Sequence, residues 1–162
     1  QPVIAKVHGI ATAAGCQLVA ACDLAIAENQ ARFATPGVRI GLFCSTPMTP
    51  LIRLIGRRRA MEMLMTGRFV SAEEALHFGL VNKVVDKDDL DRAARDWAHE
   101  IGQFSRFTLG LGKEAFYAQA DLDEAGSYAH TKEVIAMNCL AEDAQEGMSA
   151  FLDKREPIWK DR

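Results

Sequence analysis

The fold is decided by the stretch Pro2-Val3-Ile4-Ala5-Lys6-Val7-His8-Gly9-Ile10-Ala11-Thr12-Ala13-Ala14-Gly15-Cys16-Gln17-Leu18, in which an apolar strand runs through small residues into an apolar helix. A helix that begins in this way leaves its first backbone N–H groups without intrahelical partners. These donors lie at the positive end of the helix dipole and can hold an oxygen that becomes negative during a reaction. The small side chains beside them let a substrate carbonyl approach the backbone. The alternative interpretation is a purely structural strand-to-helix connection packed with small residues.

The sequence outward from this stretch changes character near residues 47–50. In the first half, apolar runs at residues 3–7 and 23–27 are typical of buried strands, and they flank the helix expected over residues 13–21. A third short strand is possible at residues 32–34. The pattern therefore predicts an α/β fold that opens with a β-α-β unit.

The second half predicts helices almost throughout. Gly56 and Gly67 are expected to end the first two of these helices in the left-handed conformation. Ser71 and Glu74 have the spacing of a capping box, and Gly79 is expected to stop that helix. The expected helices cover residues 50–56, 58–66, 71–78, 88–101, 107–119, 122–140 and 143–153, with a short strand over residues 80–85. Their apolar faces favour self-association.

Composition and charge exclude several classes of protein. The chain has 162 residues, of which 49% are hydrophobic and 25% charged, as in an ordinary globular domain. Its formal net charge of -3 gives no general attraction for nucleic acid. The run Arg57-Arg58-Arg59 is interpreted as a solvated helix face, with an anion contact as the alternative. Because charges interrupt every apolar run, we expect no membrane partner and a cytoplasmic location, or the mitochondrial matrix in a eukaryote.

The four cysteines show no paired Cys-x-x-Cys spacing and no accompanying set of histidines. We therefore expect no metal site, and we interpret the cysteines as buried free thiols. Cys16 and Cys22 lie six residues apart near the first helix and are expected to be neighbours. A catalytic thiol at Cys44 would need a base, and the sequence nominates none.

Several motifs along the chain occur in the order of one known protein family. They lie at residues 1–5, 13–18, 21–23, 33–42, 60–67, 72–75, 79–85 and 146–155. Together these motifs resemble those of the crotonase superfamily of enoyl-CoA hydratase/isomerase proteins. The resemblance implies the C-terminal part of a ββα spiral over residues 1–46, followed over residues 47–162 by a mainly helical oligomerisation region that would build a homotrimer or a hexamer. It also implies that the chain is the C-terminal portion of a longer protein.

The resemblance also assigns roles to individual positions. The backbone N–H of Ala14 corresponds to one donor of an oxyanion hole for an acyl-CoA thioester, and the two catalytic glutamates of hydratases fall at Gln17 and Gly37. Glutamine exchanges no proton near neutral pH and glycine has no side chain, and each lost acid–base group costs ~10² to 10⁴ in rate. Phe151 and Lys154 match positions that contact the adenine end of coenzyme A. Their alternative roles are a core aromatic and a surface lysine.

The resulting expectation is an acyl-CoA-binding protein that resembles enoyl-CoA hydratases and isomerases, which as a lyase or isomerase would act in fatty-acid metabolism. It would need no cofactor beyond the coenzyme A of its substrate. A non-catalytic acyl-CoA-binding or assembly protein is the alternative, and a hydrolase or decarboxylase of another acyl-CoA stays open because a thioester enolate needs the same hole. If only the acids are missing, glutamates at Gln17 and Gly37 should together raise hydration of crotonyl-CoA.

Overall fold

A computed structural model describes residues 1–162, which form two compact units. One unit is Val3–Ala98, and the other is Gln1–Pro2 with His99–Arg162. The division falls inside helix α5 (Leu90–Gly102). The domain boundary predicted after residue 46 stays a prediction. None of the helices is both long enough and apolar enough to cross a membrane.

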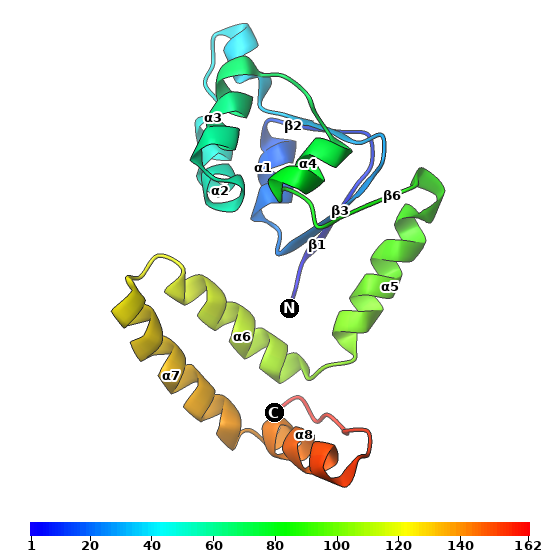
Figure 1. Ribbon diagram of the computed structural model, residues 1–162, viewed down its shortest axis with the longest axis vertical. Helices are drawn as coiled ribbons and strands as arrows, with labels where there is room; N and C mark the ends of the chain where they lie inside the picture. The colour runs from blue at the N-terminus through cyan, green and yellow to red at the C-terminus, as the bar shows by residue number, and fades with distance from the viewer. The chain divides into compact units, whose positions relative to one another are not determined.

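The first unit begins with two rounds of the same strand–strand–helix pattern (Figure 1). Strand β1 pairs in parallel with β3, and β2 pairs in parallel with β4, so that equivalent strands of successive rounds lie side by side. This confirms the predicted β-α-β unit and the short strand at 32–34. The elements are β1 (Ile4–Val7), β2 (Ile10–Thr12), α1 (Ala14–Ala21), β3 (Leu24–Glu28), β4 (Arg32–Ala34), η1 (Pro36–Ile40) and α2 (Ser45–Ile55).

Two later strands complete the sheets. Strand β6 (Lys83–Val85) adds in parallel to β3, and β5 (Val70–Ser71) adds antiparallel to β4, which gives the strand orders β1-β3-β6 and β2-β4-β5. The core of the unit lies between these sheets and the helices. Its largest fully buried side chains include Phe33, Leu51 and Met63.

Helices α2 and α3 (Arg57–Thr66) meet at Gly56, and α2 begins five residues earlier than predicted. Gly67 ends α3 in the left-handed conformation with φ 57°, as predicted. The same prediction for Gly56 is wrong, because its φ of 77° is combined with an extended ψ of 162°. Gly56 also caps the start of α3, and a residue at that position takes a non-helical, typically extended backbone.

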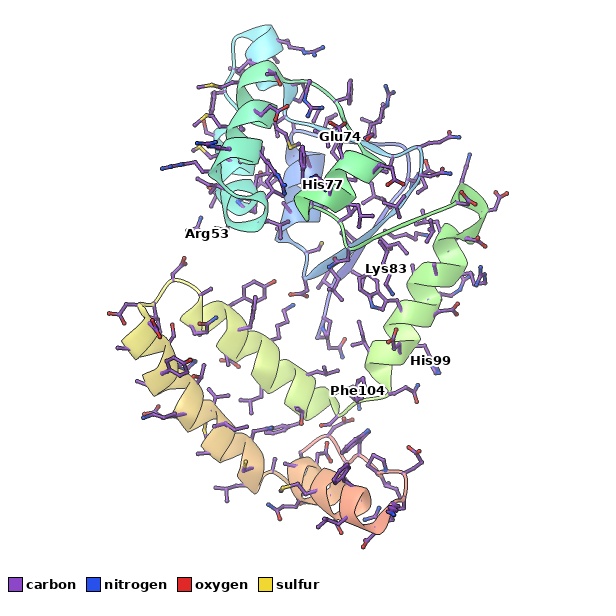
Figure 2. All side chains as sticks on the ribbon, in the orientation of Figure 1. Arg53, Glu74, His77, Lys83, His99 and Phe104 are labelled. Carbon is purple, nitrogen blue, oxygen red and sulfur yellow. The ribbon has the colours of Figure 1, made fainter.

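The capping box predicted at the start of α4 (Ala72–Phe78) is confirmed. The backbone N–H of Glu74 donates to the Ser71 hydroxyl over 3.2 Å, and the Ser71 N–H donates to the Glu74 carboxylate over 3.0 Å. Gly79 ends this helix in the left-handed conformation, as predicted. Figure 2 labels Glu74 and also Lys83, whose ammonium lies 4.1 Å from the centre of the Trp97 ring on α5. This cation–π contact ties β6 to the helix that follows the 3₁₀ turn η2 (Lys87–Asp89).

The second unit contains α6 (Arg106–Gln119), α7 (Glu124–Leu140), α8 (Glu142–Asp153) and a C-terminal tail. Helices α6 and α7 pack side by side (Figure 1). All three helices match the predicted ranges within two residues. The buried carboxylate of Asp143 fixes the tail, because it accepts hydrogen bonds from the Ser105 hydroxyl and from the N–H groups of Lys160 and Asp161.

Candidate functional site

The start of α1 carries the backbone donors that the sequence predicted. The first helical hydrogen bond of α1 runs from the Gln17 N–H to the Ala13 carbonyl over 3.0 Å. The N–H groups of Ala14, Gly15 and Cys16 therefore precede the helical ladder. Ala14 and Gly15 are exposed residues at this end of the helix.

Ala13 sets the direction in which α1 begins. Its φ of 46° and ψ of -115° are typical of glycine and rare for a residue with a side chain. The Ala13 N–H donates to the Ala34 carbonyl over 2.9 Å, which anchors the strained residue to the end of β4. The strained residue directly precedes the first N–H group of α1 that lacks a helical partner. Strained backbone is common at functional sites.

The parallel pairing of β2 with β4 brings position 37 to the carboxyl ends of these strands, where α1 also begins. Thr12 lies opposite Ala34 in that register, so α1 and η1 both begin at the carboxyl ends of paired strands. Thr35 and Pro36 connect the end of β4 to Gly37. Thr35 is fully buried, and its hydroxyl has no hydrogen-bond partner in the chain. The structure thus places the two predicted glutamate positions on neighbouring elements.

Neither position supplies an acid or a base. Gln17 is half-buried and lies one helical turn after Ala14, on the same side of α1. Its side-chain amide makes no hydrogen bond within the chain and is free to donate to or accept from a ligand. Gly37 contributes only its backbone, and its carbonyl accepts a hydrogen bond from the Leu42 N–H over 3.0 Å. The arrangement can bind and polarise a carbonyl, but these two residues cannot transfer a proton.

The site also includes two thiols, Cys16 on α1 and Cys44 at the start of α2. Cys16 and Cys44 are buried and close enough to interact electrostatically. Burial, together with the neighbouring Cys44, raises the pKa of the Cys16 thiol to about 12, so Cys16 is not a nucleophile at neutral pH. The predicted proximity of Cys16 to Cys22 stays a prediction. Sequence spacing gave no sign that Cys44 lies near Cys16.

The prediction that all the cysteines are buried is wrong for two of them. Cys22 is only partly buried, because it follows the last residue of α1. Cys139 is exposed on a face of α7 that nothing in the chain covers. Cys16, Cys44 and Cys139 are free thiols.

The predicted coenzyme A residues lie in the second unit. The Phe151 side chain is 83% exposed, so the core interpretation of this aromatic is wrong. Lys154 ends α8 in the left-handed conformation with φ 55°, and its exposed ammonium has no ion-pair partner. Its neighbour Arg155, in contrast, is paired with Glu146. Phe151 and Lys154 are thus an exposed ring and a free cation near the end of one helix.

A cavity of about 320 Å³ also lies in the second unit, and sequence reasoning did not indicate it. Its lining is mainly apolar and comes from the start of α6, from α7 and α8, and from the tail, including Phe104, Met148 and Trp159. None of the predicted site residues lines it. No group of three or more His, Cys, Asp or Glu side chains is arranged to hold a metal ion.

Comparison with known proteins identifies the family to which this chain belongs. The sequence profile of the enoyl-CoA hydratase/isomerase family matches residues 1–162. A crystal structure of an enoyl-CoA hydratase from Mycobacterium smegmatis superposes with a TM-score of 0.96 at 51% identity, over 98% of this chain and 62% of that one. The chain belongs to the enoyl-CoA hydratase/isomerase family and has the crotonase fold, as the resemblance predicted.

Within the family, the chain is similar to enoyl-CoA hydratase domain-containing protein 3. The rat mitochondrial protein of that name is 48% identical over 158 residues, which are 98% of this chain and 53% of the relative. The crystal structure of the human protein superposes with a TM-score of 0.94 at 49% identity, over 98% of this chain and 62% of that one. The chain spans about half the length of the curated relatives it matches.

Proposed function

We propose that this chain is part of an acyl-CoA-binding protein that holds the thioester carbonyl against the start of α1. The observation that carries the proposal is the position of Ala14. It is an exposed residue, its N–H precedes the first helical hydrogen bond of α1, and it directly follows the strained residue Ala13. A carbonyl placed there gains a fixed hydrogen-bond donor and the positive end of the helix dipole. Both interactions strengthen as the oxygen becomes negative. The family to which the chain belongs supports an acyl-CoA as the ligand.

The proposed protein does not hydrate enoyl thioesters by the two-carboxylate route. That route needs one group to take a proton from water and another to deliver a proton to the α-carbon. Gln17 and Gly37 occupy the corresponding positions and perform neither step. Gln17 instead offers its amide as a hydrogen-bond partner for the ligand. An enolate-stabilising reaction whose proton transfers use other groups is compatible with these residues, and so is binding without turnover.

In the proposed complex, Phe151 and Lys154 bind the coenzyme A end of the ligand. Phe151 offers an exposed aromatic face for the adenine, and Lys154 offers an unpaired ammonium for a phosphate. We propose that they act on the ligand of a neighbouring subunit in a homotrimer or hexamer. The apolar side chains exposed on the helices of the second unit, such as Ile135 and Leu140, support self-association.

The experiment uses the whole natural protein and three ligands: crotonyl-CoA, the matching thioether that lacks the carbonyl, and free coenzyme A. Calorimetry should show crotonyl-CoA bound at least about tenfold more tightly than the thioether, which corresponds to one hydrogen bond of about 1.4 kcal/mol. Equal affinities for the two would overturn the carbonyl contact. Mass spectrometry of a panel of acyl-CoAs then separates the alternatives. Unchanged ligands favour binding alone, whereas loss of the thioester or of carbon dioxide identifies a hydrolase or a decarboxylase.

We also propose that the chain is the C-terminal part of a longer protein that works in the mitochondrial matrix. The first part rests on the share of its relatives that it spans, and the second on relatives whose names describe them as mitochondrial. The intact mass of the natural protein tests the length, because the chain alone weighs 17.8 kDa. Fractionation of the source cells tests the location.

A further inference from the structure

The space beside the α-carbon of Gly37 is already filled. A Cβ atom built on Gly37 would lie 2.6 Å from the Leu42 carbonyl oxygen and 2.9 Å from the Cys44 sulfur, and both distances are shorter than real side chains show. The φ of Gly37 lies outside the left-handed range, so its backbone conformation would suit any residue. There is therefore no room for a side chain at position 37.

The atoms that fill this space cannot easily retreat. The closest is a backbone oxygen, and the same segment is fastened to Gly37 by the hydrogen bond from the Leu42 N–H to the Gly37 carbonyl. The Cys44 side chain is short and buried, and its residue caps the start of α2. A side chain at position 37 would have to open the turn that joins η1 to α2.

Helix η1 is equally confined on its other side. A Cβ atom built on Gly67, the residue that ends α3, would lie 3.0 Å from the Pro36 α-carbon and 3.3 Å from a Val38 methyl group. The end of α3 thus lies close to the Pro36 backbone and to the Val38 side chain, and these two residues flank Gly37 in the sequence. Helix η1 is held between the end of α3 and the segment from Leu42 to Cys44, so it has no room to shift away from either.

We infer that Leu42 and Cys44 are specificity-determining residues, which exclude any side chain at position 37 and so keep a second carboxylate out of the site. The functional half of this inference rests on the proposed function above. It predicts that hydratase chemistry cannot be recovered by adding back the two glutamates, because the second has no room. This differs from the expectation in which only the acids are missing.

The steric half is tested by the melting temperature of the whole natural protein. Gly37→Ala should lower it by about 3 °C or more, the shift expected when one extra carbon is forced into a packed site. Gly102→Ala is the matched control, because that helical glycine has open space around its α-carbon and should melt at the same temperature or higher. Cys44→Ala removes the sulfur, so Gly37→Ala should cost less in that background. A Gly37→Ala protein that melts within about 1 °C of the natural one would overturn the inference.

If Gly37→Ala yields no folded protein while Gly102→Ala does, the inference is supported, and the Cys44→Ala background then shows whether the sulfur contributes. The functional half compares Gln17→Glu with Gln17→Glu/Gly37→Glu in crotonyl-CoA hydration. The second glutamate should add less than about tenfold, and a larger gain would overturn the inference. The melting experiment contains no acyl-CoA, so it stands or falls separately from the proposed function.

Discussion

Ala13 donates its backbone N–H to the carbonyl of Ala34 over 2.9 Å, in a conformation that usually requires glycine. This bond joins the start of α1 to the end of β4, the strand that leads to Gly37. A non-glycine residue in such a conformation costs about 1–3 kcal/mol and persists only where its surroundings hold it. Here the surroundings are two parallel strands and the first turn of the helix, whose first N–H groups directly follow Ala13.

Ala13→Gly should therefore stabilise the protein. Removing the Cβ relieves the strain at φ 46°, and the gain exceeds the extra entropy of an unfolded glycine, so we expect the free energy of unfolding to rise by about 1 kcal/mol. Urea unfolding followed by fluorescence measures the change. Ala14→Gly is the control and should lower the free energy of unfolding, because glycine is less stable than alanine at an ordinary helical position. A loss of stability in Ala13→Gly would contradict the assigned strain.

Ser71→Ala should cost about 1 kcal/mol of unfolding free energy, the usual value of an N-terminal cap. The change removes the acceptor of the Glu74 N–H and leaves the rest of α4 intact. Glu73→Gln is a fitting comparison, because Glu73 lies in the same helical turn outside the capping box and should change stability by less than half as much. Equal losses in the two variants would show that helix charge, and not the cap, matters at this position.

The C-terminal tail should make stability depend on pH in the acid range. The Arg155 guanidinium and the N–H of Ile158 lower the pKa of Glu146 from 4.5 to about 2. A carboxyl whose pKa falls on folding contributes stability that is present above its unfolded pKa. That contribution should disappear as the pH falls from about 4.5 towards about 2.

Glu146→Gln should remove this contribution. The variant should be less stable than the natural protein at neutral pH, and the difference between their melting temperatures should shrink between pH 4.5 and pH 2. Thermal unfolding across that range measures it. Glu133→Gln, on an exposed part of α7, serves as the control for loss of a charge. A constant difference across the range would contradict the pairing of Glu146 with the tail.

The cysteines should differ in their reactivity towards iodoacetamide. The Cys16 thiol is buried, and its pKa of about 12 keeps it protonated at neutral pH, whereas the Cys139 thiol is exposed. Peptide mapping after a short treatment of the folded protein should find Cys139 modified and Cys16 intact. In urea both should react. Early modification of Cys16 in the folded protein would show that the edge beneath Gly37 opens in solution.

Local patterns in the sequence predicted local structure well. The capping box at Ser71, the strand at 32–34 and the helices of the second unit all follow from periodicity and cap residues, which act within one or two turns. Strand β2 was missed because three residues give too short a pattern to distinguish a strand from a connection. The extended ψ of Gly56 was missed because Gly56 both ends α2 and caps the start of α3.

The packing around the candidate site was not predictable from the sequence. The motif at 13–18 indicated the backbone donors at the start of α1, and the family resemblance assigned the two glutamate positions to Gln17 and Gly37, whose roles stay predictions. The close approach of Leu42 and Cys44 to Gly37 depends on how a turn closes in three dimensions, and so does the electrostatic effect of Cys44 on Cys16. No pattern along the chain encodes either of them. The strain at Ala13 likewise depends on its bond to Ala34, a residue on another strand.

The proposed hydrogen bond from the Ala14 N–H to the carbonyl of an acyl-CoA thioester can be observed in the infrared stretch of that carbonyl. The carbonyl is labelled with ¹³C in crotonyl-CoA, which is bound to the whole natural protein. A hydrogen bond from Ala14, aided by the dipole of α1, weakens the carbonyl bond, so the stretch should shift to lower frequency than in water. A bound thioester whose carbonyl absorbs at or above its frequency in water would show that Ala14 does not hold it.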